Sequence, residues 1–245
     1  MTARAIGVFA LVLAMASPAL AGPANSTIGA KKLEQDMVHS GGVGAPSVMY
    51  EWWNKGKGKM DWGLSGELVY TDWLAAHTSR FIKIGLGING MLRWNFVRNK
   101  KPKVQNEFAL LVKPGILIAG NRADTFTFGI KGEIGLPFTI DVHERVTVVT
   151  GGFLPIGGYF SSSGNAGEVP ILIRMGVEIM ANENVAPWFF FDLGPGIAFG
   201  GGGSNTGFAW RLGAGTAFWG VLGKNKNKSD SSATASAEPA AEPDE

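Results

Sequence analysis

The sequence has no cysteine and only three histidines among its 245 residues. Without cysteine it can form no disulfide framework, no thiolate metal site and no cysteine nucleophile. Lysine and arginine number 22 against 20 acidic residues, so no basic excess points to nucleic acid as a partner. Charged residues make up only 17% of the chain, whereas hydrophobic residues reach 45%, a balance that excludes a disordered chain.

Long hydrophobic runs are also missing, because no stretch approaches the ~18 consecutive apolar residues that a membrane-spanning helix needs. The apolar run Ile6–Ala16 follows one positive charge, Arg4, and ends before Pro18. A small-residue pattern then ends at Ala21, so residues 1–21 are predicted to form a secretory signal peptide. The exported chain is therefore expected to be either a soluble protein or a transmembrane β-barrel.

Alternation of bulky apolar residues with small or polar ones is the main pattern that is present, together with 36 glycines. Four long segments show it clearly: 81–96, 125–141, 169–179 and 208–218. Five weaker segments follow the same period: 48–53, 60–71, 106–118, 146–159 and 185–199. A period of two over such lengths predicts strands, and short connections between consecutive strands predict antiparallel pairing. Among the expected loops are 72–79, 120–123, 161–167 and 200–205 at one end of the strands, and the turn 141–144 lies at the other.

The two faces of these strands differ in a way that favours a membrane barrel. One face is bulky and aromatic, whereas the other is mainly Gly, Ala, Ser and Thr with isolated charges. Small residues suit a crowded barrel interior and bulky apolar residues suit lipid. A soluble lipocalin-like protein would instead bury its large apolar residues. Outward aromatic residues also gather near both sets of strand ends, as at two membrane interfaces: Trp62, Trp94, Phe96, Phe138 and Phe218, then Tyr70, Phe126, Phe128, Phe199 and Phe208.

The isolated charges on the inward face form the candidate site. Sorting by alternation places twelve of them in the lumen: Glu51, Glu67, Lys83, Arg93, Glu107, Lys113, Lys131, Glu133, Arg174, Glu178, Asp192 and Arg211. Six acids then meet six bases, and charges inside a narrow lumen must pair to offset the loss of water. We expect Arg174, Glu178, Asp192 and Arg211 to form one buried network that closes the lumen.

In this pattern, the chain from Val48 to Val221 resembles small bacterial outer-membrane β-barrel proteins. The resemblance implies an all-β fold, a transmembrane antiparallel up-and-down barrel in the outer membrane. Its partners would be outer-membrane lipid and the barrel-assembly machinery, which reads a last strand that is aromatic near its end. Phe218 and Trp219 are similar to that signal, although more than twenty residues follow them here.

The resemblance also bears on strand number and domain limits. Single-chain bacterial barrels have even strand numbers, so eight to ten strands are expected, and a weak strand within Leu33–Gly44 favours ten. Residues 22–45 then form an N-terminal segment and residues 46–222 form the barrel. Residues 223–245 form a disordered periplasmic tail, either a plain solvated end or a tether to the cell wall.

No motif in the chain predicts an enzyme, a cofactor or a metal site. Gly85–Gly90 matches the glycine pattern of dinucleotide sites, but the strand alternation continues through it, so no helix begins there. Of the histidines His39, His77 and His143, only His77 has a nearby hydroxyl, Ser79, at the predicted outer rim. We therefore expect a non-enzymatic, structural barrel with a largely plugged polar lumen. The alternatives are a narrow pore for small polar solutes and an outer-membrane enzyme acting on lipid or peptide.

Overall fold

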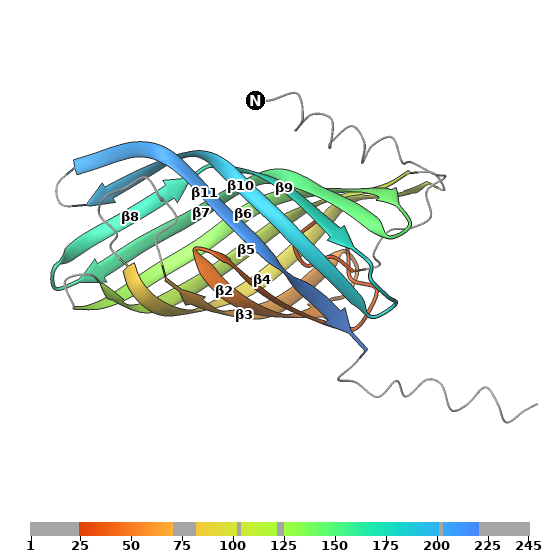
Figure 1. Cartoon of the computed structure of the whole chain (residues 1–245), viewed down its shortest axis with the longest axis horizontal. Helices are drawn as coiled ribbons and strands as arrows, with labels where there is room; N and C mark the ends of the chain where they lie inside the picture. The colour runs from red at the N-terminus through yellow and green to blue at the C-terminus, as the bar shows by residue number, and fades with distance from the viewer. Residues whose placement is uncertain (1–24, 71–81, 102–103, 122–124, 201–202, 221–245) are drawn as a thin grey trace, which may run out of the picture.

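The computed structural model describes residues 25–70, 82–101, 104–121, 125–200 and 203–220. No helix in these ranges is long and apolar enough to cross a membrane. The chain forms β1 (Met37–Ala45), β2 (Ser47–Lys55), β3 (Met60–Val69), β4 (Ile82–Lys101), β5 (Val104–Asn121), β6 (Phe126–His143), β7 (Val146–Ser161), β8 (Gly164–Pro170), β9 (Leu172–Ile179), β10 (Val185–Gly200) and β11 (Gly203–Trp219). Neighbouring strands in the wall are antiparallel, and β1 pairs with β11, which closes the sheet into an up-and-down barrel (Figure 1).

β8 and β9 together fill one position in the wall. Both pair with β7 on one side and β10 on the other, in one unchanged register. The interruption falls at Ile171, after Pro170, which has no N–H group to donate to the ladder. The barrel therefore has ten strand positions. This confirms the all-β barrel and the preferred strand number, and β1 is the weak strand expected within Leu33–Gly44.

The alternation in the sequence separates the outside of the wall from the lumen. On β4, Leu86 is 66% exposed, whereas the next residue, Gly87, faces inward against Glu67. The start of β4 departs from the predicted faces, because the register with β5 shifts between Ile82 and Ile84. Ile82 is therefore buried and Lys83 is exposed, which is the reverse of the prediction for both residues.

Several connections are shorter than predicted. Only residues 162–163 separate β7 from β8, where a loop over 161–167 was expected, and β6 continues through Asp141 to His143. Strand pairing continues into these segments although Gly, Asn and Asp are disfavoured in strands, because pairing with the neighbouring strands outweighs the weak preference of single residues. The predicted signal peptide, the tail 223–245, and His77 and Ser79 lie outside the described residues.

The barrel has two distinct ends. We call the end where β1 begins and β11 finishes the terminal end, and the turns after β2, β6 and β9 lie there too. Residues 25–33, which we call the lumenal segment, are buried inside the barrel near this end (Figure 1). β1, β2 and β3 are short, with nine, nine and ten residues, so the turn after Ala45 lies beside Leu212, halfway along β11.

Candidate functional site in the lumen

All of the predicted lumen charges except Lys83 lie inside the barrel, and they fall into two layers. The layer near mid-height, which we call the wall layer, consists of residues on the strands only: Glu51, Glu67, Lys113, Lys131, Glu133, Arg174, Asp192 and Arg211. The layer nearer the terminal end, which we call the segment layer, contacts the lumenal segment: Asp61, Arg93, Glu107, Asp141 and Glu178. Two of these, Asp61 and Asp141, were not among the predicted charges.

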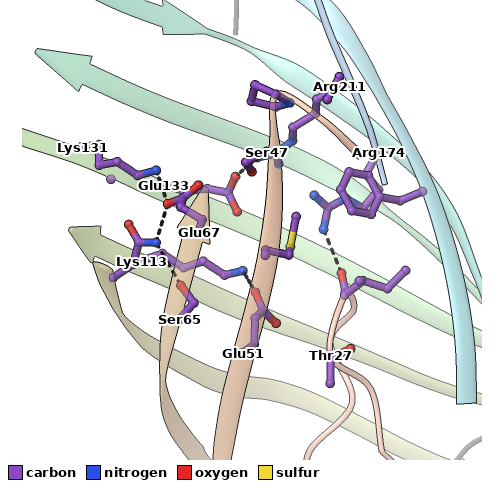
Figure 2. Close-up of a pocket in the computed structure, with 17 residues that line it drawn as sticks. Thr27, Ser47, Glu51, Ser65, Glu67, Lys113, Lys131, Glu133, Arg174 and Arg211 are labelled. Atoms are coloured by element: carbon purple, nitrogen blue, oxygen red, sulfur yellow. Dashed lines mark hydrogen bonds and ion pairs between the residues drawn. The ribbon is translucent and has the colours of Figure 1, made fainter. Parts of the chain in front are cut away.

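Pairs across the lumen hold the wall layer together. Lys113 Nζ on β5 lies 2.8 Å from Glu51 Oε1 on β2, and Lys131 on β6 pairs with Glu67 on β3 (Figure 2). Asn89 on β4 donates a further hydrogen bond of 2.7 Å to Glu67. The two ion pairs join strands that are not neighbours in the wall, so they close the lumen at this height.

The predicted network around Arg174 forms with one change of member. Arg174 Nε and Nη2 donate to the two oxygens of Asp192 at 2.8 and 2.9 Å, and Arg211 also donates to Asp192. Arg211 then reaches across the lumen to Glu133, which takes the place predicted for Glu178. Local alternation placed Glu178 and Arg174 on one face, but Glu178 lies closer to the terminal end and bonds to the lumenal segment instead.

Two lysines of the lumenal segment form buried ion pairs with the wall. Lys31 Nζ lies 2.6 Å from Asp141 Oδ1, and Lys32 Nζ lies 2.5 Å from Asp61 Oδ1. Both aspartate side chains are fully buried. Arg93 is the second cation on Asp61, at 2.9 Å, and its guanidinium lies over the ring of Trp53.

Wall carboxylates also accept hydrogen bonds from the backbone of the lumenal segment. Glu178 Oε1 accepts from the Thr27 N–H at 3.0 Å. Glu107 Oε2 accepts from the Lys32 N–H at 2.9 Å, and Asp61 Oδ2 accepts from the Leu33 N–H at 3.0 Å. The acids therefore recognise peptide N–H groups as well as lysine side chains.

Wall donors complete the recognition of the backbone. Arg93 Nη1 donates to the carbonyl oxygens of Ser26 and Gly29, at 2.6 and 3.1 Å. Arg174 Nη1 donates to the carbonyl of Ile28 at 3.0 Å, so it links the wall layer to the segment. Buried peptide groups need such partners because water is excluded.

Close packing accompanies these polar contacts. A Cβ atom on Gly29 would overlap the methyl group of Thr139, so only glycine fits without a shift of the wall. Ile28 and Leu33 pack in the same apolar cluster as Trp53 and Phe153. The segment therefore fills the terminal half of the lumen.

A cavity of about 80 Å³ lies beside the lumenal segment, on the side of the wall layer. Thr27 and Ile28 line one side of it, and Glu51, Lys113 and Arg211 are among the wall residues around it (Figure 2). This volume has room for a few water molecules beside the charges of the wall layer. The wall layer therefore borders a small space that several of its charged side chains reach, whereas the segment layer is tightly filled.

Apolar residues fill the lumen nearer the opposite end. Val69, Ile82, Leu117 and Ala119 form a buried cluster with Tyr159. The hydroxyl of Tyr159 donates a 2.7 Å hydrogen bond to Glu168, a buried acid that was also missed from the sequence. Side chains thus occupy the interior on both sides of the cavity.

Other residues considered in the sequence have ordinary structural surroundings. β4 runs unbroken through Gly85–Gly90. His39 Nδ1 lies 2.6 Å from the Tyr50 hydroxyl, and its ring stacks on Phe218. Among the described residues, no group of three or more His, Asp or Glu side chains is placed to hold a metal ion.

Comparison of the chain with protein-family models, with curated proteins and with solved structures finds no match. A functional assignment must therefore come from the geometry of the barrel and its lumen.

Proposed function

We propose that the protein is a non-enzymatic β-barrel of the bacterial outer membrane, with a structural role and a lumen closed to solutes. The outer face supports the membrane location. Bulky side chains such as Leu86, Ile88, Ile130 and Phe126 are each more than half exposed on it. An apolar band of this kind is stable in lipid and unfavourable in water.

The filled lumen is the observation that supports a barrel closed to solutes. The lumenal segment and the wall layer occupy its terminal half and middle, and an apolar cluster occupies the part beyond. A conducting pore needs a continuous polar path, whereas the cavity here holds only about 80 Å³. Lipid and the barrel-assembly machinery are the partners that this proposal implies, and cell-wall contact through the tail 223–245 remains part of it.

Cell fractionation tests the location and planar bilayers test the closed lumen. We expect the protein to remain with outer membranes and to require detergent for extraction. After insertion into a planar bilayer, it should show no steady ion conductance. Release by osmotic shock would contradict the membrane location, and steady conductance of the native protein would favour the narrow pore.

A matched pair of substitutions tests the outer face. Leu86→Arg should cost about 2–4 kcal/mol of folding stability in lipid vesicles, because a charge would face hydrocarbon. Asn165→Arg, at an exposed position on β8, should cost almost nothing. Equal tolerance of arginine at the two positions would contradict the assigned lipid-facing surface.

A further inference from the structure

The two layers of the lumen differ in their balance of charge. The wall layer is neutral by itself, since Glu51, Glu67, Glu133 and Asp192 meet two lysines and two arginines of the strands. The segment layer is not neutral: its four carboxylates, Asp61, Glu107, Asp141 and Glu178, meet only the wall cations Arg93 and Arg98 among the described residues. Lys31 and Lys32 of the lumenal segment add positive charge to this layer, on Asp141 and Asp61.

The segment layer also recognises a main chain. Glu178, Glu107 and Asp61 each accept from a backbone N–H of the segment, and Arg93 binds two of its carbonyls. Donors and acceptors that lie opposite successive peptide groups are the arrangement of a peptide-binding site. Here the bound peptide belongs to the same chain.

The path of the lumenal segment allows it to leave without threading through the barrel. Asn25 Oδ1 accepts hydrogen bonds from the N–H groups of Glu34 and Gln35, at 2.9 and 3.2 Å. The two ends of the segment therefore meet, and residues 34–36 are exposed before β1 begins. The segment is a closed loop inserted from the terminal end.

We propose that the terminal half of the lumen is a binding site for a cationic peptide loop, and that residues 25–33 are its resident, exchangeable ligand. The inference rests on the proposed function only in taking the lumen as closed by this segment. Asp61 and Asp141 select lysine in the ligand, and the backbone contacts of Glu107, Glu178 and Arg93 fix the position of the loop.

The test cleaves the connection between the lumenal segment and β1 in the folded, full-length protein. A protease site placed at residues 34–36 is cleaved after the barrel has folded in detergent micelles. We expect the N-terminal fragment to stay bound and then to exchange with a fluorescent peptide of residues 22–36, as seen by anisotropy. A peptide with Lys31→Ala and Lys32→Ala should bind at least about 100-fold more weakly, since two buried ion pairs are lost.

Two wall substitutions provide the matched comparison. Asp141→Asn removes the partner of Lys31 and should weaken binding of the labelled peptide by at least about tenfold. Glu51→Gln makes the same chemical change in the wall layer, where Glu51 pairs with Lys113, and should leave the affinity within about twofold. In the uncut chain, Gly29→Leu should expose residues 25–33 to protease while the barrel persists.

Three results would overturn the proposal. The barrel could unfold when the fragment leaves, which would make the segment part of the folding core rather than a ligand. The fragment could fail to exchange, or the lysine-free peptide could bind equally well. None of these measurements uses membrane location or native conductance, so a failure of the proposed function would be seen separately.

Discussion

The two charged layers of the lumen are built from similar side chains but differ in the source of their partners. In the wall layer both members of each pair come from strands, as with Lys113 and Glu51. In the segment layer the partners of Asp61 and Asp141 include Lys32 and Lys31, which precede the first strand. Charges on the strands can be found from alternation, whether they pair across the lumen or bind the lumenal segment, whereas Lys31 and Lys32 on the irregular segment cannot.

The layers also differ in their contact with water where the wall layer borders the cavity. Asp61 and Arg93 are almost completely buried, while the Lys113 side chain beside the cavity retains 19% exposure. Breaking a buried pair leaves an uncompensated charge and costs far more than breaking a partly hydrated one. The comparison therefore predicts a gradient of stability effects from the segment layer to the wall layer.

The largest effect is expected at Asp61. Asp61→Ala removes the shared partner of Lys32, Arg93 and the Leu33 N–H, so two buried cations lose their counter-charge. We expect a loss of about 3–5 kcal/mol in the free energy of unfolding. Guanidinium unfolding of the barrel in detergent micelles, followed by tryptophan fluorescence, measures it.

Asp36→Ala is the control for this loss. Asp36 is exposed and lies just outside the lumenal segment, so its removal should change stability by less than about 0.5 kcal/mol. Similar losses for the two variants would mean that the segment layer is hydrated and that the two layers do not differ.

An intermediate effect is expected at Asp192. In Asp192→Asn, Arg211 keeps its partner Glu133, and Arg174 keeps the rings of Phe153 and Phe190 at 3.9 and 4.2 Å. Loss of charge-assisted hydrogen bonds should then cost about 2–3 kcal/mol in the same unfolding assay. A loss as large as that of Asp61→Ala would show that Glu133 does not compensate Arg211.

The smallest effect is expected at Lys113. Lys113→Gln leaves Glu51 with its hydrogen bond from Trp53 Nε1 at 2.9 Å, and the cavity beside it admits water. We expect less than about 1 kcal/mol, the usual value for a partly exposed pair. The single variant Glu51→Gln and the double variant complete a double-mutant cycle. A coupling energy near that of a buried pair would contradict the view that water reaches Glu51 and Lys113.

Most of the barrel could be predicted from sequence because strand faces repeat every two residues. That period identified the outward face of β6 and β11 and the inward position of Arg174 and Asp192. It was wrong for Ile82 and Lys83, since a register shift between strands leaves no trace in a local period.

The candidate site was less predictable, for a physical reason. The predicted balance of six acids and six bases included Lys83 and omitted Asp61 and Asp141. Asp61 follows the alternation beside outward Trp62 and could have been found. Asp141 was placed on the polar face of the segment 125–141 but also at the start of the turn 141–144, and it was left out of the lumen charges. Lys31 and Lys32 carry no periodic signal, because the segment around them forms neither helix nor strand.

The short strands of one side of the wall have a consequence for the proposed membrane. β1, β2 and β3 contain nine or ten residues each, whereas β4 contains twenty. A transmembrane strand needs ~9–11 residues, so these three are only just long enough to cross a bilayer. The side of the wall with the shortest strands thus sets the bilayer thickness that the barrel fits. A thicker bilayer would have to compress locally beside β1–β3. Lipid chain length should accordingly govern how well the protein inserts.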